Sequence, residues 1–389
     1  MSLNPVISKL GRRLRLAMIG GGEGSFIGAM HRQAARMDDR YEIVTGVFSS
    51  NPEKSKNVAV ELGLDPGRIY PTVSEMLSQE CLRKDGIDAV AIMTPNDSHY
   101  EYSVAALEKG LDVICDKPMT NTYKESLALH NKVKETGLIF CLTHNYTGYP
   151  MVRQAKAMIE ANELGEIRLV QVEYVQGGRA DESKVLTPEM SRKYDPIRGG
   201  AARSMVDVGT HAHNLLRFMS GLEVSQVCAE IGASVPGRSL NDYAGALIRL
   251  SNGARGTFWA TQAAAGVENG LRIRISGSKG TIEWCQEIPQ TLSYKPLHGP
   301  AETRTPNGPG TYPFSAHSSR IKAGHPEGFP EAFANLYTDA ADAIVARKLG
   351  VTVDPLSSFF PNSYDGLMTA RFVECVIESS NLNGSWVDC

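Results

Sequence analysis

The chain has 389 residues, which at about 150 residues per domain is enough for two domains. Its 40 Lys and Arg residues and 43 Asp and Glu residues nearly cancel, which argues against a nucleic-acid partner, because such a partner requires a basic face. No apolar stretch approaches the roughly 20 residues of a membrane span, the N-terminus lacks a signal-peptide core, and the seven cysteines contain no C-x-x-C pair. The sequence therefore predicts a cytoplasmic protein with no membrane association and no metal site.

From residue 12 to residue 143, short apolar runs alternate with amphipathic stretches. The apolar runs are continuous, which is typical of strands buried on both faces of a parallel sheet. This alternation predicts a doubly wound Rossmann sheet. The expected strands are Leu14–Ile19, Tyr41–Phe48, Ile87–Met93, Leu111–Cys115 and Leu138–Leu142, and the expected helices are Phe26–Met37, Pro52–Leu62, Ser98–Lys109 and Tyr123–Thr136.

Residues 144–389 have a different pattern and are predicted to form a second α/β domain around a large, mostly antiparallel open sheet. Apolar and polar residues alternate in Glu166–Gln176, and turn signals at Asn252-Gly253 and Ser278-Lys279-Gly280 indicate hairpins. Residues 287–329 are rich in Pro and Gly and are expected to form a long loop. The other expected strands are Val224–Ile231, Tyr243–Leu250, Ala254–Thr261, Leu271–Ser276 and Thr281–Cys285, and the expected helices are Met151–Asn162, Pro330–Arg347 and Pro361–Ser379.

A glycine-rich turn connects the first strand to the first helix. Such a turn allows the backbone to approach a pyrophosphate, which the helix N-terminus also favours. The spacing departs from G-x-G-x-x-G, because the third glycine is either replaced by Ser25 or delayed to Gly28. A plain tight turn is the alternative interpretation. The candidate cofactor-binding residues here are Gly20, Gly22, Gly24, Ser25 and Phe26.

The end of the second strand is where an acidic residue would bind the 2′-hydroxyl of an NAD ribose. The sequence instead places Ser49 and Ser50 there, with Lys54 about one helical turn later. Small polar residues near a cation favour NADP, or the use of both cofactors. Alternatively, residues 49–51 simply cap the next helix.

Two further turns follow predicted parallel strands, at the sheet edge where ligands bind. One reads Thr94-Pro95-Asn96-Asp97-Ser98-His99, and the other reads Asp116-Lys117-Pro118. Each turn taken alone is equally well interpreted as a solvated strand end.

Residues 199–214 contain the remaining candidate catalytic group. If the segment is helical, Asp207 and His211 are four residues apart and share a face, so that the carboxylate can hold the imidazole for acid–base chemistry. A structural His–Asp pair in a buried helix is the alternative. His213 points elsewhere, so these residues do not form a metal triad.

These motifs, in this order and at these separations, resemble the family named for glucose–fructose oxidoreductase, inositol dehydrogenase and the rhizopine-catabolism protein (Gfo/Idh/MocA). The resemblance covers most of the chain and implies a Rossmann domain followed by an α/β domain whose open sheet carries oligomer contacts. It implies that Lys117 touches the nicotinamide ribose and the substrate hydroxyl, that His211 transfers the proton, and that Asp207 assists His211. It further implies NAD or NADP contacts from Thr94, Pro95, Asn96, His99, Asp116 and Asn145, and substrate contacts from Tyr146, Asn214 and His325.

We therefore expect an NAD(P)-dependent dehydrogenase that acts on a secondary alcohol of a sugar, cyclitol or related polyol. We also expect a homodimer or homotetramer formed through the open sheet. One alternative is a sugar-interconverting or glycoside-cleaving enzyme that retains its cofactor. The other is a non-enzymatic NAD(P)-binding sensor, which the set Lys117, Asp207 and His211 disfavours, because a sensor has no need of a proton-transfer group.

Overall fold

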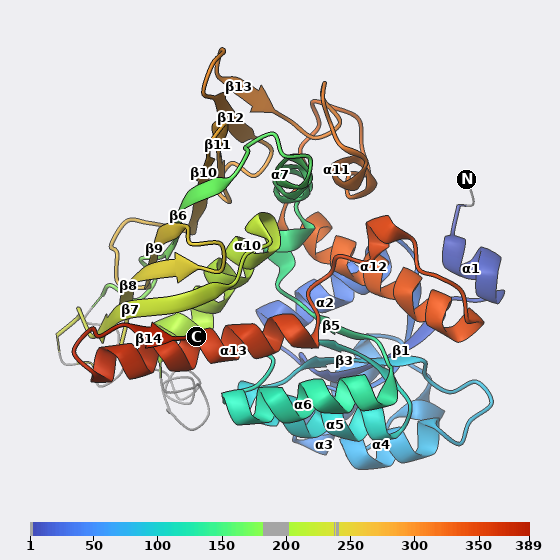
Figure 1. Cartoon of the computed structure of the whole chain (residues 1–389). Helices are drawn as coiled ribbons and strands as arrows, with labels where there is room; N and C mark the ends of the chain where they lie inside the picture. Colours follow the sequence, from blue (N-terminus) through green and yellow to red (C-terminus); the bar gives the residue numbers. More distant parts are fainter. Residues whose placement is uncertain (1–2, 182–201, 237, 239–240) are drawn as a thin grey trace. The chain divides into compact units, whose positions relative to one another are not determined.

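The computed structural model describes residues 3–181, 202–236, 238 and 241–389 (Figure 1). The chain divides into two units, and each is described by itself. The first comprises Met1–Asn145 and Phe329–Leu367, and the second comprises Tyr146–Gly328 and Met368–Cys389. The sequence places one boundary, between residues 143 and 144. The first unit also takes in residues 329–367, because the apolar face of helix α12 (Phe329–Leu349) packs on its core.

The first unit is built on a five-stranded sheet in which all neighbouring strands are parallel, in the order β2-β1-β3-β4-β5. This confirms the predicted doubly wound Rossmann sheet. The strands are β1 (Leu14–Gly20), β2 (Tyr41–Val47), β3 (Ala89–Met93), β4 (Asp112–Cys115) and β5 (Phe140–Leu142). The helices are α1 (Pro5–Leu10), α2 (Phe26–Met37), α3 (Pro52–Glu61), α4 (Val73–Glu80), α5 (His99–Glu108), α6 (Tyr123–Thr136), α12 and the start of α13 (Ser363–Asn381).

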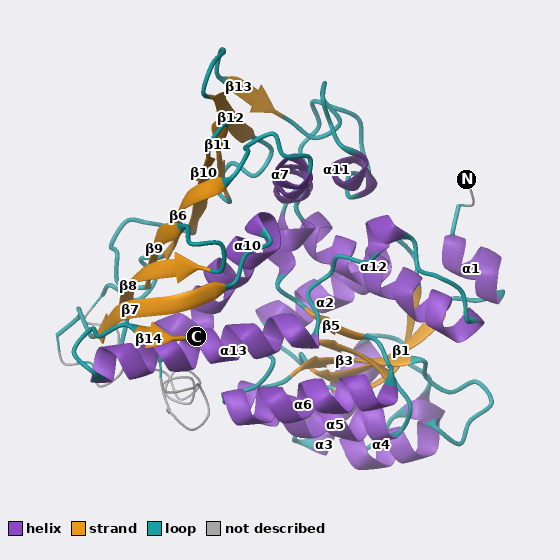
Figure 2. Ribbon diagram, viewed as in Figure 1, coloured by secondary structure: helices purple, strands orange, loops and turns teal. Residues whose placement is uncertain are grey.

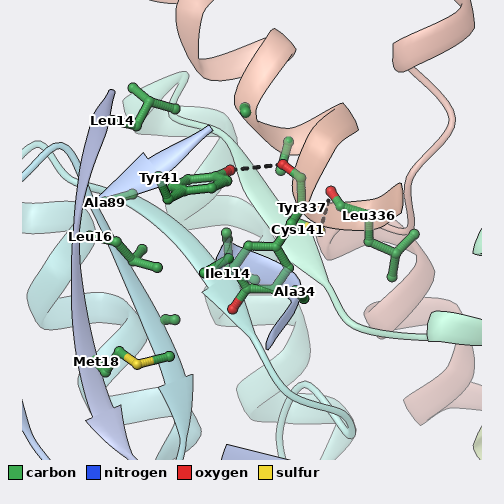
Figure 3. Close-up of a cluster of buried hydrophobic side chains, with 14 of the residues drawn as sticks. Leu14, Leu16, Met18, Ala34, Tyr41, Ala89, Ile114, Cys141, Leu336 and Tyr337 are labelled. Atoms are coloured by element: carbon green, nitrogen blue, oxygen red, sulfur yellow. Dashed lines mark hydrogen bonds between the residues drawn. The ribbon is translucent and has the colours of Figure 1, made fainter. Parts of the chain in front are cut away.

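Both faces of this sheet are buried, which explains why its strands read as continuous apolar runs. In β1, Leu16 and Met18 belong to the core that includes α2 and α12, whereas Ala17 and Ile19 belong to the core that includes α4, α5 and α6. Figure 3 shows the first core, where the Tyr41 hydroxyl donates to the carbonyl oxygen of Tyr337 in α12.

The second unit contains a nine-stranded sheet in the order β13-β12-β11-β10-β6-β9-β8-β7-β14 (Figure 2). Only β6 and β9 pair in parallel, so the sheet is mostly antiparallel, as predicted. Its strands are β6 (Ile167–Val175), β7 (Val224–Gly232), β8 (Tyr243–Leu250), β9 (Arg255–Thr261), β10 (Gly270–Gly277), β11 (Gly280–Cys285), β12 (Leu292–Pro296), β13 (Glu302–Arg304) and β14 (Val387–Asp388). Its helices include α7 (Pro150–Glu160), α10 (Thr210–Ser220), α11 (Pro313–His317) and most of α13.

The prediction of one long loop over residues 287–329 was wrong. The segment adds β12 and β13 to the sheet and forms α11. The buried residues of β12, Leu292 and Tyr294, repeat only once, too briefly for an alternating pattern to be recognised among prolines and glycines. In the described parts of the chain, no helix is long and apolar enough to cross a membrane.

Candidate active site

In the first unit, the turns singled out from the sequence all lie at the carboxyl ends of parallel strands. The strand order reverses between β1 and β3, and in open α/β sheets ligands bind at such a switch point. The glycine-rich turn follows β1 and the Thr94–His99 turn follows β3. Asp116 and Lys117 follow β4, and Asn145 follows β5.

The third glycine of the nucleotide-binding pattern is Gly28. A Cβ atom on Gly28 would lie 2.4 Å from the carbonyl oxygen of Gly21, so the first turn of α2 packs directly on the glycine turn. This close packing is the task of the third glycine in dinucleotide-binding turns. Ser25 is instead the N-cap of α2, and its Oγ accepts the Gly28 N–H at 3.1 Å. At Gly22 a Cβ would lie 2.6 Å from the Phe48 carbonyl oxygen, so this glycine is also sterically required.

The residues around this turn fit a dinucleotide. The N–H groups of Phe26 and Ile27 open α2 and have no intrahelical acceptor, so they can bind a pyrophosphate that the helix dipole also favours. Gly24 adopts φ +73° with nothing within 4 Å of its Cβ position, which leaves space above the turn. At the end of β5, Asn145 is 3% exposed, and its Nδ2 has no partner among the described residues. A bound polar ligand would satisfy this buried donor.

At the end of β2, capping accounts for part of the polar cluster. Asn51 caps α3 by accepting the Lys54 N–H at 3.1 Å, and the Ser49 Oγ accepts the Asn51 N–H at 3.1 Å. The side chains of Ser50 and Lys54 remain exposed. No acidic residue stands at the strand end, in agreement with a site that does not discriminate against a 2′-phosphate.

His99, expected at the nicotinamide, lies inside the unit and joins two turns. It is fully buried, with Nδ1 2.8 Å from the Pro118 carbonyl oxygen and Nε2 2.9 Å from the Thr94 carbonyl oxygen. Each ring nitrogen thus lies within hydrogen-bond distance of a main-chain carbonyl oxygen, and a neutral ring donates its one N–H to one of the two. The ring therefore lies between the Thr94 turn and the Lys117-Pro118 turn, and its contact with a cofactor stays a prediction. Of the other residues in this turn, Pro95 is exposed, and Thr94 and Asn96 are half-buried.

Asp116 lies directly before Lys117 and is held by two neighbours. Its Oδ1 accepts the Thr143 Oγ1–H at 2.7 Å and lies 3.7 Å from the His31 Nε2. Burial acts to raise the pKa of the Asp116 carboxyl, but the His31 ring, the Lys117 ammonium and the Thr143 hydroxyl outweigh it, so that the pKa lies below its usual value. The half-buried Lys117 is therefore preceded by a fixed anion.

In the second unit, Asp207 and His211 lie on one helical segment, as predicted. Residues 199–201 at its start lie outside the described residues. Met205–Gly209 forms a π-helical turn that continues into α10, and such wide turns are frequent at functional sites. His211 is 8% exposed, and its ring packs edge-on against Tyr146, with centroids 4.8 Å apart. His213 points elsewhere: it stacks on Phe372 at 4.3 Å and contacts the Thr369 hydroxyl.

Asp207 is held by three donors that sequence reasoning did not identify. Its Oδ2 accepts from Arg179 at 3.1 Å, from Arg203 at 3.2 Å and from the Gln262 Nε2 at 2.9 Å. Two guanidinium groups fix the carboxylate as an acceptor. The assistance of His211 by Asp207 stays a prediction, and the structure adds that the same carboxylate binds Arg203 on its own helical segment and Arg179 and Gln262 from two other segments.

A chain of polar side chains leads from Asp207 to the ring neighbour of His211. Gln262 donates to Gln176 at 3.0 Å, Gln176 donates to Asn269 at 2.7 Å, and Tyr174 donates to the same Asn269 Oδ1 at 2.7 Å. Tyr174 and Tyr146 share a hydrogen bond of 2.5 Å. Tyr174, Gln176, Gln262 and Asn269 lie at the ends of the neighbouring strands β6, β9 and β10, at the same end of these three strands. Polar residues at successive strand ends were the sequence signal for this cluster.

The three predicted substrate residues have different surroundings. Tyr146 is buried beside His211. Asn214 is 1% exposed, and its Oδ1 has no partner among the described residues. His325 is exposed, with its Nδ1 3.2 Å from the Lys322 carbonyl oxygen, and in the described part of the chain it makes no contact with Asp207, His211 or Tyr146.

Comparison with known proteins gives a consistent result over the whole chain. Residues 14–144 match the model of the "Oxidoreductase family, NAD-binding Rossmann fold", and residues 152–283 match the "GFO/IDH/MocA C-terminal domain". An oxidoreductase structure from Sinorhizobium meliloti is 44% identical, with a TM-score of 0.88, over 97% of this chain and 99% of that one.

Two relatives are known with a bound ligand or a named activity. An inositol dehydrogenase homolog from Azotobacter vinelandii, solved with NAD⁺, is 33% identical with a TM-score of 0.93, and both chains are covered completely. A second structure of that homolog holds NADH and myo-inositol. The levoglucosan dehydrogenase of Pseudarthrobacter phenanthrenivorans is 27% identical over 97% of this chain and 98% of its own.

Proposed function

The chain belongs to the Gfo/Idh/MocA family of NAD(P)-binding oxidoreductases, and we propose that it oxidises a secondary alcohol of a cyclitol, sugar or related polyol. The observation that carries this proposal is the buried His211, which lies in the second unit on the same helical segment as the half-buried Asp207, among tyrosine and amide side chains. A proton-transfer group in polar, water-poor surroundings suits alcohol oxidation. Relatives named for levoglucosan and inositol support the same substrate class.

Each proposed catalytic residue has one task. A bound NAD⁺ or NADP⁺ would supply the hydride acceptor for the oxidation of the substrate carbon. His211 takes the proton from the substrate hydroxyl oxygen, and Lys117 places its positive charge against the negative charge that develops on that oxygen. Asp207 holds the polar cluster around His211 in place.

The cofactor residues have supporting roles in the same proposal. The turn from Gly20 to Ser25 and the start of α2 bind the pyrophosphate, and Thr94, Pro95, Asn96 and Asn145 border the ribose and nicotinamide. Asp116 and His99 act as positioning residues, because their polar atoms hold Thr143, His31 and the main chain of the two turns. Tyr146 and Asn214 contact the substrate.

The test is a panel of polyols, including myo-inositol, levoglucosan and common aldoses, offered with NAD⁺ or NADP⁺ and followed by nicotinamide absorbance. We expect His211→Ala to lower kcat by about 10²–10⁴-fold, the usual contribution of a general base. His213→Asn is the matched control, because His213 lies on the same helix but packs on Phe372, and it should retain near-parental kcat. If His211→Ala oxidises the polyol as fast as the parent does, His211 is not the general base.

The absorbance readout also separates the alternatives. An enzyme that retains its cofactor would form product with no net change in absorbance, and a sensor would form none. A cytoplasmic location and a dimer or tetramer built on the open sheet of the second unit complete the proposal. The scattered cysteines support the first, and the exposed apolar side chains of the sheet support the second.

A further inference from the structure

The orientation of the Gln262 amide is determined by its partners. A carboxylate that is bonded to Arg179 and Arg203 offers only acceptor atoms, so the Gln262 atom 2.9 Å from Asp207 Oδ2 must be the NH₂ group. The same NH₂ group donates to the Gln176 Oε1 at 3.0 Å. Both N–H donors of Gln262 are thereby used, and its carbonyl oxygen takes part in neither of these two hydrogen bonds.

That carbonyl oxygen has no hydrogen-bond donor among the residues that the structure describes. Gln262 is 5% exposed, and its Oε1 is fully shielded from solvent. Buried polar atoms in folded proteins nearly always have a partner, and an exception usually marks a place for a water molecule or a ligand. The side chain cannot turn to find a donor without losing its bonds to both Asp207 and Gln176.

The rest of the polar cluster keeps Gln262 in this position. Burial raises the pKa of the Tyr174 hydroxyl well above its usual value, so this hydroxyl remains a donor, and its proton goes to the Asn269 Oδ1 at 2.7 Å. Gln176 donates to the same oxygen at 2.7 Å, which leaves its own carbonyl for Gln262. The donor and the acceptor of each hydrogen bond between Tyr174 and Asp207 are thus determined. Among the described members of this cluster, Gln262 Oε1 is the acceptor that is left without a donor.

We propose that Gln262 is a specificity-determining residue whose Oε1 accepts a hydrogen bond from a substrate hydroxyl other than the one that is oxidised. The inference rests on the proposed function, because it places the substrate beside Asp207 and His211. It narrows the substrate class to compounds with a second hydroxyl group near the reacting carbon. A site that holds a buried acceptor for a hydroxyl rejects analogues lacking it, because the acceptor is then left without a partner.

The experiment compares the parent with Gln262→Met on myo-inositol and levoglucosan, whichever is oxidised, and on the monodeoxy analogues of that compound. We expect the parent to lose at least tenfold in kcat/KM on one analogue whose missing hydroxyl is not the oxidised one. In Gln262→Met this discrimination should fall below threefold, while discrimination at the other positions persists. A merely structural role would lower all rates and leave the ratios unchanged.

Gln176→Met is the matched control, because it removes one link of the cluster but retains the Gln262 carbonyl, and it should keep the parental ratio. If Gln262→Met does not fold, Gln262→Asn, which keeps the amide on a side chain one methylene shorter, gives the same comparison. An unchanged ratio in the Gln262 variants, or a parent that tolerates every deoxy analogue, overturns this inference alone. A parent that oxidises no polyol overturns the proposed function and this inference together.

Discussion

The charge of the Asp116 carboxylate, directly before Lys117, is determined by a few single contacts. The carboxylate would be protonated at higher pH if burial acted alone, but the contacts with His31, Lys117 and Thr143 keep its pKa below the usual value. Its ionised form therefore stabilises the folded state at pH values above the ordinary carboxyl pKa of about 4, and this contribution is lost as the pH falls through the lowered folded value.

Thr143→Val tests this contribution of the Asp116 carboxylate to stability. The substitution removes the hydroxyl that donates to Asp116 at 2.7 Å, so the pKa of Asp116 should rise toward the value that burial favours. The unfolding free energy should fall by about 1–3 kcal/mol near neutral pH, and the loss should shrink as the pH falls through the lowered folded pKa of Asp116, below which the carboxyl is protonated in both proteins. Urea titrations across this pH range measure the difference. Thr45→Val is the control, because the Thr45 hydroxyl donates to the uncharged main-chain carbonyl of Arg68. The unfolding free energy that this variant loses should not vary with pH.

Gly28→Ala tests the assignment of the third glycine. A methyl group at this position meets the main chain of Gly21 at 2.4 Å, so α2 must move away from the turn that binds the pyrophosphate. NADH affinity, measured by fluorescence titration, should fall at least tenfold, or about 1.4 kcal/mol. Gly232→Ala has nothing within 4 Å of the new methyl group and should bind NADH like the parent. Parental affinity in Gly28→Ala would show that the turn does not contact the cofactor.

At this scale the sequence identified residue types but not their partners. His99 was expected at the cofactor, and its two main-chain contacts depend on how two strand ends meet. His31 was not singled out, because it lies inside a helix whose periodicity gave no sign that it reaches Asp116. Contacts between residues distant in sequence follow from the sheet order, which the local pattern does not contain.

The elements of the first unit were predictable because each carries a strong local signal. Phe26–Met37 and Tyr123–Thr136 are the observed bounds of α2 and α6, with Ser25 and Thr122 as N-caps. Helix α4 was missed, since its eight residues contain only two turns of pattern. Strand β14, with two residues, exists only because β7 offers it a paired edge. Short elements thus depend on tertiary pairing, which no local window records.

The junction of β2 and α3 carries a prediction about the cofactor. Ser50 and Lys54 are exposed at a strand end that lacks an acid, so NADP⁺ should bind within a hundredfold of NAD⁺, a difference of about 2.7 kcal/mol. Lys54→Ala should weaken NADP⁺ severalfold and leave NAD⁺ unchanged. Lys56→Ala, an exposed lysine two residues further on, is the control. Dissociation constants for both cofactors decide the matter, and a larger preference for NAD⁺ would refute dual use.

For the molecule as a whole, the open face of the nine-stranded sheet is the feature that a monomer leaves unexplained. The other face is buried, through residues such as Val170, Val172 and Phe258. On the open face, Leu169, Leu247 and Trp259 are 59%, 52% and 40% exposed. On strand β9, Thr257 pairs with Leu247 of β8, and Arg255 pairs with Leu169 of β6. Trp259 lies on β9 two residues after Thr257, so the three apolar side chains are close together on this face. Clustered apolar side chains of this kind mark protein–protein contacts.

We expect the chain to form a dimer or tetramer through this face, and Leu169→Lys combined with Leu247→Lys should reduce it to monomers, because burying two ammonium groups against a second copy is unfavourable. Sedimentation velocity of the parent and the double variant measures the change. Leu382→Lys alters a leucine that is as exposed as Leu247, 52%, but lies just beyond the end of α13, and it should leave the assembly intact.

Salt should have little effect on this assembly. Salt weakens ion pairs such as Arg274 and Glu283, 2.8 Å apart on β10 and β11 of the same sheet, but it does not weaken contacts of the leucines and Trp259, so high salt alone should not dissociate the copies. If the parent sediments as a monomer, this face does not join copies of the chain, and its apolar side chains bind a different partner.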